Sequence, residues 1–153
     1  MALNCPCGST LSYQACCQPL HDGDLHASSA EQLMRSRYSA FYLGKVSYLI
    51  DTLHPNNRQL DDAITLEQSI DETQWLGLRI IKHKALSQTA TVEFVGFYQD
   101  DPIGQLHERS RFIKHDGLWF YVDGEILPSV KLARNEQCFC GSGHKFKKCH
   151  ATS

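Results

Sequence analysis

Apolar residues between positions 31 and about 53 recur at every third or fourth place, which is the spacing of an amphipathic helix. Ser28 or Ser29 can cap the start of this long helix, and Gly44 marks a bend within it. A second, weaker helical pattern covers residues 60–70. The first half of the chain is therefore predicted to be mainly helical.

After Trp75 the hydrophobic pattern changes to the alternation that is typical of strands. Four β-rich runs follow, at residues 75–86, 89–99, 106–115 and 118–126. Asp116-Gly117, between the last two runs, is a strong hairpin signal. Helices followed by antiparallel strands predict an α+β fold, in which the long N-terminal helix packs on one cone-like, curved antiparallel sheet.

All seven cysteines lie in two short segments, CPCGSTLSYQACC at 5–17 and CFCGSGHKFKKCH at 138–150. In a reducing compartment, clustered cysteines are more often metal ligands than disulfides, and structural zinc requires four sulfur or nitrogen ligands in a tetrahedron. Gly8 and Gly141 would let the backbone turn around the ion. Each segment supplies four candidate ligands: Cys5, Cys7, Cys16 and Cys17 in the first, and Cys138, Cys140, Cys149 and His150 in the second. Two zinc ions are predicted, and iron or a redox dithiol stays open as an alternative.

Each cysteine segment resembles the SEC-C metal-binding motif of the SecA translocation ATPase tail, and the second matches it almost letter for letter. With LMRSRYSAFYLGKVSYLIDTLHP, WLGL and ERSRFIKHDGLWFYVDG between them, the whole chain resembles the bacterial YchJ family. The resemblance implies a nuclear-transport-factor-2-like cone domain at 28–127, between SEC-C-type zinc modules at 1–20 and 134–153. It assigns the ligand roles to the same eight residues. The first copy departs from the motif, because Thr10 replaces its second glycine and its helix has no lysine.

Charge separates the two ends of the chain, although the formal net charge is only -2. Residues 131–150 contain five basic side chains and one acidic one, whereas residues 1–27 contain two acidic side chains. Such a basic segment can dock on an acidic protein or on phosphates. The predicted partner-binding residues are Lys145, Lys147 and Lys148. A protein or ribonucleoprotein partner is expected, and the SecA resemblance implies one linked to protein export or to the ribosome.

Composition and pattern also indicate what the chain does not do. The low net charge gives no reason to expect sequence-specific DNA binding. A secretory signal pattern and an apolar run of about 18 residues are both missing, so we expect no membrane insertion and a cytoplasmic location. The oligomeric state is left open.

Several polar and aromatic residues of the middle domain form a possible pocket for a small anionic ligand. They are Arg35, Arg37, Tyr38, His54, Arg109, Arg111, Trp119, Tyr121 and Asp123. Cross-strand ion pairs and core packing explain the same residues, and no catalytic residue is assigned. His21, His26, His83 and His115 are expected at the surface.

Three functions remain. The first is a metal-binding adaptor whose basic C-terminal module docks a partner. The second is a small-molecule binder or enzyme that uses the cone pocket. The third is a thiol-based metal or redox sensor, with the N-terminal thiolates as the labile set.

Overall fold

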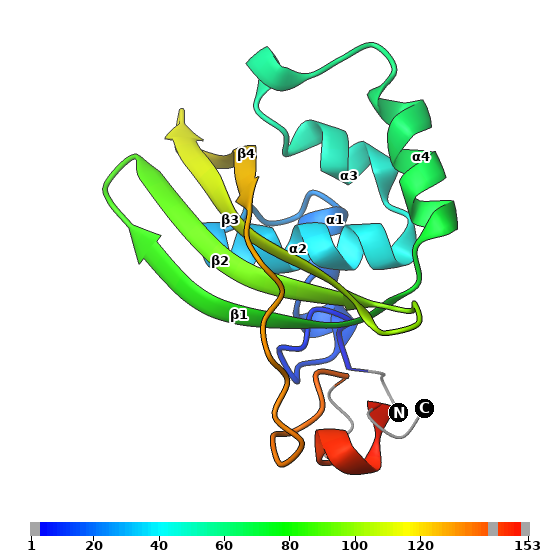
Figure 1. The fold of residues 1–153 in the computed structure, drawn as a ribbon. Coiled ribbons are helices and arrows are strands. Elements are labelled where there is room, and N and C mark those ends of the chain that lie inside the picture. The colour runs from blue at the N-terminus through cyan, green and yellow to red at the C-terminus, as the bar shows by residue number, and fades with distance from the viewer. Residues whose placement is uncertain (1–3, 141–143, 151–153) are drawn as a thin grey trace.

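The computed structural model describes residues 4–140 and 144–150. Its first part is helical and its second part is a sheet (Figure 1). The helices are α1 (Gln18–His21), α2 (Ala30–Leu43), α3 (Val46–Asp51) and α4 (Asp62–Glu72). The strands are β1 (Trp75–Ala85), β2 (Thr89–Tyr98), β3 (Gly104–His115) and β4 (Leu118–Ile126). Single 3-10 turns lie at Tyr13–Ala15 (η1), Pro55–Asn57 (η2) and Phe146–Lys148 (η3).

The single long N-terminal helix of the sequence prediction is not confirmed, because the chain forms two shorter helices, α2 and α3, in its place. Ser29 caps α2 as predicted, since its hydroxyl accepts a hydrogen bond from the Gln32 amide. Gly44 ends α2 in the left-handed conformation, with φ of 79°. The expected bend is therefore a complete break. The helix predicted at 60–70 is α4.

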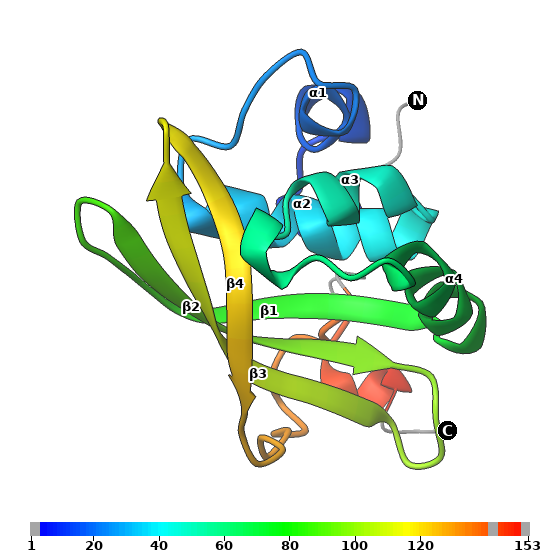
Figure 2. The same cartoon turned by 90° about the horizontal axis from the view of Figure 1, so that it is seen from above.

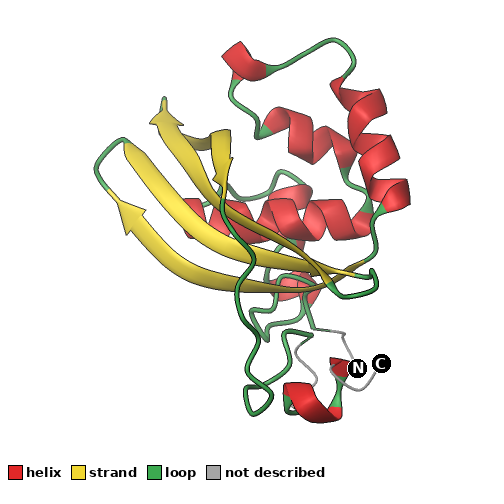
Figure 3. Ribbon diagram, in the orientation of Figure 1, coloured by secondary structure: helices red, strands yellow, loops and turns green. Residues whose placement is uncertain are grey.

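The four strands form one antiparallel sheet in the order β1-β2-β3-β4. The hairpin predicted at Asp116-Gly117 is present, with both residues at positive φ, 52° and 80°. The sheet curves around α2, as the secondary-structure view shows (Figure 3). The α+β fold with a curved antiparallel sheet is thus confirmed.

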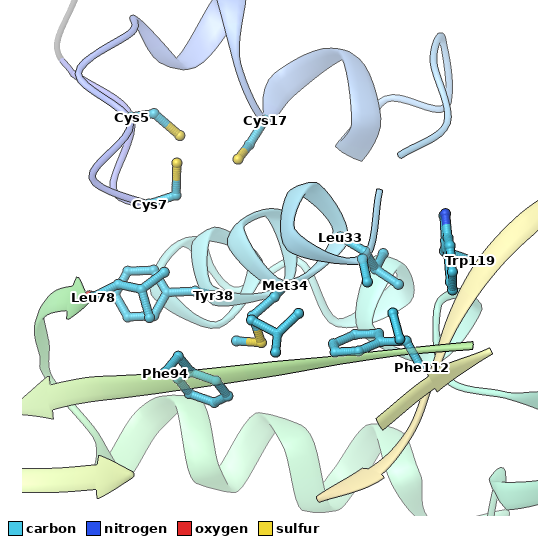
Figure 4. Packing of buried hydrophobic residues seen from close by; sticks show 13 residues of the cluster. Cys5, Cys7, Cys17, Leu33, Met34, Tyr38, Leu78, Phe94, Phe112 and Trp119 are labelled. Carbon is cyan, nitrogen blue, oxygen red and sulfur yellow. The ribbon is translucent and has the colours of Figure 1, made fainter. Parts of the chain in front are cut away.

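Each face of the sheet carries its own apolar cluster. On the helix side, Leu33 and Met34 of α2 pack with Phe94 and Phe112 of the strands (Figure 4). On the opposite side, Val95 and Phe97 of β2 pack against the C-terminal segment. Figure 2 shows α2 and η3 on opposite sides of β1. None of the helices in the described ranges is long and apolar enough to cross a membrane.

Candidate metal centres

The four N-terminal thiols converge on one point. The sulfur atoms of Cys5, Cys7, Cys16 and Cys17 all lie within 4.8 Å of one another. Cys16 Sγ is 3.6 Å from Cys7 Sγ and 3.8 Å from Cys17 Sγ. Gly8, in the turn between the first pair and the rest, has φ of 80° as expected. The sequence therefore folds this segment into a four-thiol cage.

The N-terminal cage is part of the core of the protein. Cys5, Cys7 and Cys17 are 3%, 0% and 1% exposed, and they belong to the same apolar cluster as Leu33 and Met34. Figure 4 shows these thiols facing one another directly above α2. Burial of this degree makes the cage a structural element of the domain.

Polar contacts also tie the cage to α2. Cys5 Sγ lies 3.4 Å from Ser39 Oγ, and Arg35 donates from Nη1 to the Cys7 carbonyl at 2.7 Å. His21 Nε2 lies 2.8 Å from the carbonyl oxygen of Ser36, and its Nδ1 lies 2.7 Å from the Tyr13 hydroxyl. His21 is therefore half-buried and hydrogen-bonded, which corrects its predicted place at the surface. Burial lowers its pKa.

The C-terminal cluster has the same arrangement, with one histidine. The ligand atoms of Cys138, Cys140, Cys149 and His150 lie within 4.8 Å of one another. Cys140 Sγ is 3.7 Å from Cys149 Sγ. His150 presents Nδ1 to the thiols, at 2.9 Å from Cys138 Sγ and 3.3 Å from Cys149 Sγ. Gly141, the predicted counterpart of Gly8, lies outside the described residues.

An aromatic stack attaches this second module to the convex face of the sheet. The rings of Phe139 and Phe97 are parallel, with centroids 4.1 Å apart. Gly77 of β1 makes room for the segment, because a Cβ there would lie 2.1 Å from the carbonyl oxygen of Phe139. Arg79 adds an ion pair with Glu136 at 3.3 Å. Val95 of β2 also belongs to the buried apolar cluster that contains Cys138 and Phe139.

Both clusters fit a tetrahedral metal ion. A zinc ion with Zn–S bonds of about 2.3 Å places its sulfur ligands about 3.8 Å apart. The sulfur–sulfur separations of 3.6, 3.7 and 3.8 Å match that edge. They are far from the bond length of a disulfide, roughly 2.05 Å. The seven cysteines, all within the described residues, therefore form no disulfide and have a ligand-like arrangement.

The pKa values of the thiols show that the thiolate form needs a nearby positive charge. Burial raises the pKa of Cys16 and that of Cys138 to about 11, so their surroundings oppose the thiolate form at neutral pH. Hydrogen bonds from Cys17 and Cys5 lower the pKa of Cys7. A divalent cation would stabilise all the thiolates of a cluster together. The two cysteine clusters thus have the donor chemistry of a metal site.

Comparison with known proteins agrees with this geometry. The family model for the YchJ middle NTF2-like domain matches residues 29–124, and the SEC-C motif model matches residues 134–152. A UPF0225 protein of Vibrio parahaemolyticus is 42% identical, with 97% of this chain and 99% of that protein covered. The chain belongs to the YchJ (UPF0225) family. A UPF0225 protein of Enterobacter sp. strain 638 is 44% identical over 95% of both chains.

Two solved structures resemble this member of the YchJ family. The solution structure of a SEC-C motif containing protein from Rhodopseudomonas palustris superposes with a TM-score of 0.77 at 36% identity, and covers 82% of this chain and 100% of that one. The crystal structure of a SEC-C motif containing protein from Psychrobacter arcticus superposes with a TM-score of 0.72 at 36% identity. It covers 97% of this chain and 95% of that one.

The predicted partner-binding lysines lie on and beside η3 of the C-terminal module. Lys145 and Lys148 are exposed, and Lys147 is half-buried. Short backbone contacts hold this turn, since the Lys147 amide donates to the Arg134 carbonyl at 2.9 Å. The lysines therefore stand on a fixed part of the module.

Only some of the predicted pocket residues come together. A cavity of about 190 Å³ lies between α2, α4 and the sheet, and Arg37, Tyr38 and Tyr121 line it. Arg109 and Arg111 instead point away from the helices: Arg109 pairs with Glu93 at 3.4 Å, and Arg111 pairs with Asp123. These are the cross-strand ion pairs that competed with the pocket interpretation.

A bulge on β4 places two of the predicted pocket residues, Tyr121 and Asp123, on opposite faces of the sheet. Phe112 faces Tyr121, whereas the preceding residue Arg111 faces Asp123, so Val122 is an extra residue on β4. One extra residue reverses the alternation beyond it. Tyr121 therefore points into the cavity while Asp123 lies on the outer face.

The remaining three predicted pocket residues lie elsewhere. Arg35 binds the Cys7 carbonyl, and His54 Nδ1 accepts a hydrogen bond from the Asn56 amide at 3.2 Å. Trp119 is buried and borders a separate cavity of about 380 Å³ between the N-terminal segment and α3. Sequence reasoning missed Glu108 and Ser110, which line the 190 Å³ cavity. Glu108 and Ser110 alternate with Arg109 and Arg111 along β3, so strand alternation is the signal that could have found them.

Proposed function

We propose that this protein is a metal-binding adaptor: two zinc ions complete its two clusters, and the basic C-terminal module docks an acidic protein or a ribonucleoprotein. The observation that carries the proposal is that two equivalent ligand sets lie in different surroundings. The N-terminal set lies in the core, whereas the C-terminal set supports an exposed turn rich in lysine.

The N-terminal ion would act as a structural element. Its ligands would be Cys5, Cys7, Cys16 and Cys17, and its contribution to folding would reach α2 through the shared core. Because three of these thiols are at most 3% exposed, oxidants have little access to them. Burial therefore favours the structural role over the redox-sensor alternative for this cluster.

The C-terminal ion would act as a platform. Three thiolates and a neutral histidine on a divalent ion carry a charge of about -1, which the surrounding basic residues exceed. The module would therefore stay positive with its metal bound. Ribosomes are the first partner to test, because the resemblance to the SecA tail implies export-linked or ribosome-linked machinery and because ribosomal RNA is an acidic surface.

The test is co-sedimentation with purified bacterial ribosomes, comparing the wild type with the triple variant Lys145→Gln, Lys147→Gln and Lys148→Gln. Wild-type binding should weaken between about 50 and 200 mM salt. The variant should bind roughly tenfold more weakly, since three contacts of about 0.5 kcal/mol each sum to about 1.5 kcal/mol. Native mass spectrometry should find two zinc ions per chain in both proteins.

A matched control carries the same charge change on the body of the protein: Lys45→Gln, Lys82→Gln and Lys84→Gln, all at exposed positions. If both triple variants lost binding equally, the interaction would depend only on the net charge of the protein. That result would reject the C-terminal module as the docking site. If the wild type binds no ribosomes, the next test is a pull-down from lysate. The adaptor proposal would be rejected if both triple variants captured the same proteins from that lysate. Bound iron, or one ion per chain, would contradict the two-zinc assignment.

A further inference from the structure

The cavity of about 190 Å³ between α2, α4 and the concave face of the sheet contains charges that the metal clusters do not use. We propose that it binds a small neutral molecule with an apolar body and a head that both donates and accepts hydrogen bonds, such as a primary amide. This site is separate from the proposed docking function. It also differs in chemistry from the anion pocket that the sequence suggested.

Arg37 supplies a buried cation to the cavity. Its side chain lies over the ring of Tyr121, with Cζ 4.6 Å from the centroid, and Nη1 donates to the Leu49 carbonyl at 2.8 Å and to Thr52 Oγ1 at 2.6 Å. Burial lowers its pKa to about 10, so the guanidinium stays charged at neutral pH. Among the described residues, no carboxylate lies within 4.0 Å of it. Its charge is therefore not neutralised by direct contact.

Glu108 supplies a buried carboxylate to the same cavity, and it is only 9% exposed. Its Oε1 accepts hydrogen bonds from Ser110 Oγ at 2.8 Å and from Tyr121 Oη at 2.9 Å. Within the described part of the chain, no hydrogen bond reaches the second carboxylate oxygen. Glu108 thus keeps acceptor capacity. Burial of the Tyr121 ring and the negative charge of Glu108 beside it both raise the pKa of the phenol.

A buried cation and a buried anion that share a cavity without touching each other favour a neutral ligand. A second anion would be repelled by Glu108, and a second cation by Arg37. A neutral head can instead donate to Glu108 and accept from Arg37. Tyr38, which is 3% exposed, adds a hydroxyl that has no hydrogen-bond partner among the described residues.

The walls and the size limit the body of the ligand. Met34, Phe41, Phe94 and Leu106 make most of the lining apolar. Figure 4 shows Met34 on α2 and Phe94 on the sheet approaching each other across this layer. A volume of about 190 Å³ is below the roughly 300–1,000 Å³ of pockets for drug-sized ligands. A molecule with a single ring or a short chain is the expected size.

Three probes of nearly equal shape test the charge argument: benzamide, benzoate and benzylamine. Each is titrated into the metal-loaded full-length protein at neutral pH, with the methyl signals of Met34 and Leu106 and the indole signal of Trp75 followed by NMR. Benzamide should shift these signals and bind at least roughly tenfold more tightly than the two charged probes. Equal affinities, or shifts that avoid these three residues, would overturn the proposal.

Two variants separate binding from structure. Glu108→Gln removes the negative charge, so benzoate should gain affinity relative to benzamide, whereas Glu93→Gln on the outer face should leave the order of affinities unchanged. An equal decrease for all probes in Glu108→Gln would contradict a direct contact. If Glu108→Gln does not fold, Ser69→Leu decides the question, because Ser69 lines the cavity although no residue of α4 is buried. The larger side chain should narrow the cavity and abolish benzamide binding, and retained binding would reject the site.

Discussion

At the scale of single residues, equivalent ligands have very different surroundings. Cys7 is completely buried and its carbonyl oxygen accepts a hydrogen bond from Arg35. Cys140, at the same place in the second segment, is half-buried. Because metal binding is coupled to folding wherever the ligands share a core, the two positions should respond differently to the same substitution.

We expect Cys7→Ser to destabilise the whole protein and Cys140→Ser to affect mainly its own module. Loss of a buried ligand and of its ion should cost at least about 3 kcal/mol, which corresponds to a fall of about 10 °C in Tm. Cys140→Ser should lower the metal content equally while changing the Tm of the domain by only a few degrees. Differential scanning calorimetry and native mass spectrometry measure both effects, and equal falls in Tm would contradict the structural role of the N-terminal cage.

At the scale of elements, β3 holds the segment that leads to the C-terminal module. Gln105 and the backbone of Val130 exchange two hydrogen bonds of 2.8 and 3.0 Å. His107 Nδ1 lies 2.6 Å from the Pro128 carbonyl oxygen, and its Nε2 lies 2.8 Å from Glu93 Oε2. The segment after β4 is therefore attached to the outer face of the sheet.

Glu93 makes this attachment sensitive to acid. The hydrogen bond from His107 lowers the pKa of Glu93, and Arg109 contributes in the same direction. A lowered folded-state pKa stabilises the protein above the unfolded value of about 4.3, and this stabilisation is lost as the pH falls through the lower folded value. The difference in unfolding free energy between the wild type and Glu93→Gln should be about 1 kcal/mol near neutral pH and vanish once the pH has fallen below the lowered pKa of Glu93.

Denaturant unfolding across this pH range measures the effect of Glu93. The control is Glu125→Gln, because Glu125 also pairs with Arg109, at 3.6 Å, but its side chain is 68% exposed. It should change the unfolding free energy by close to zero at every pH. Acid also protonates cysteine ligands, but that contribution is common to all three proteins and cancels in the comparison. A difference for Glu93→Gln that grows toward low pH would contradict the assignment.

At the scale of the whole molecule, one sheet separates two modules that are unequal in their packing. The N-terminal module shares the core of α2, and the C-terminal module rests on Val95 and Phe97 across the sheet. The N-terminal module is therefore part of the core of the domain, whereas the C-terminal module packs on its outer face.

Truncation should expose this asymmetry. Removing residues 134–153 should leave the far-UV circular dichroism of the α+β domain intact, with a loss of several degrees in Tm because Val95 and Phe97 become exposed. Removing residues 1–27 should prevent cooperative unfolding, since it uncovers Leu33 and Met34 and deletes the metal cage. A stable, cooperatively folded chain without residues 1–27 would contradict this description.

Much of the fold was predictable because its signals are local. The cap at Ser29 and the hairpin at Asp116-Gly117 depend on neighbouring residues only, whereas the break at Gly44 was predicted only as a bend in one long helix. The pocket was predicted less well, because one bulge at Val122 changed which side chains face inward. Such a bulge depends on the pairing of two strands and leaves no clear mark in either strand alone.

The sequence alone determined that two four-ligand segments exist, that the second carries the lysines, and that a helical half precedes an antiparallel sheet. Spacing and residue type are sufficient for these conclusions, since ligand chemistry and hydrophobic period act over a few residues. Only the tertiary structure decided that one cage lies in the core and the other on the opposite face, and that Arg37 and Glu108 share a cavity without touching. These features arise from contacts between residues far apart in the chain, which form only when the sheet curves around α2.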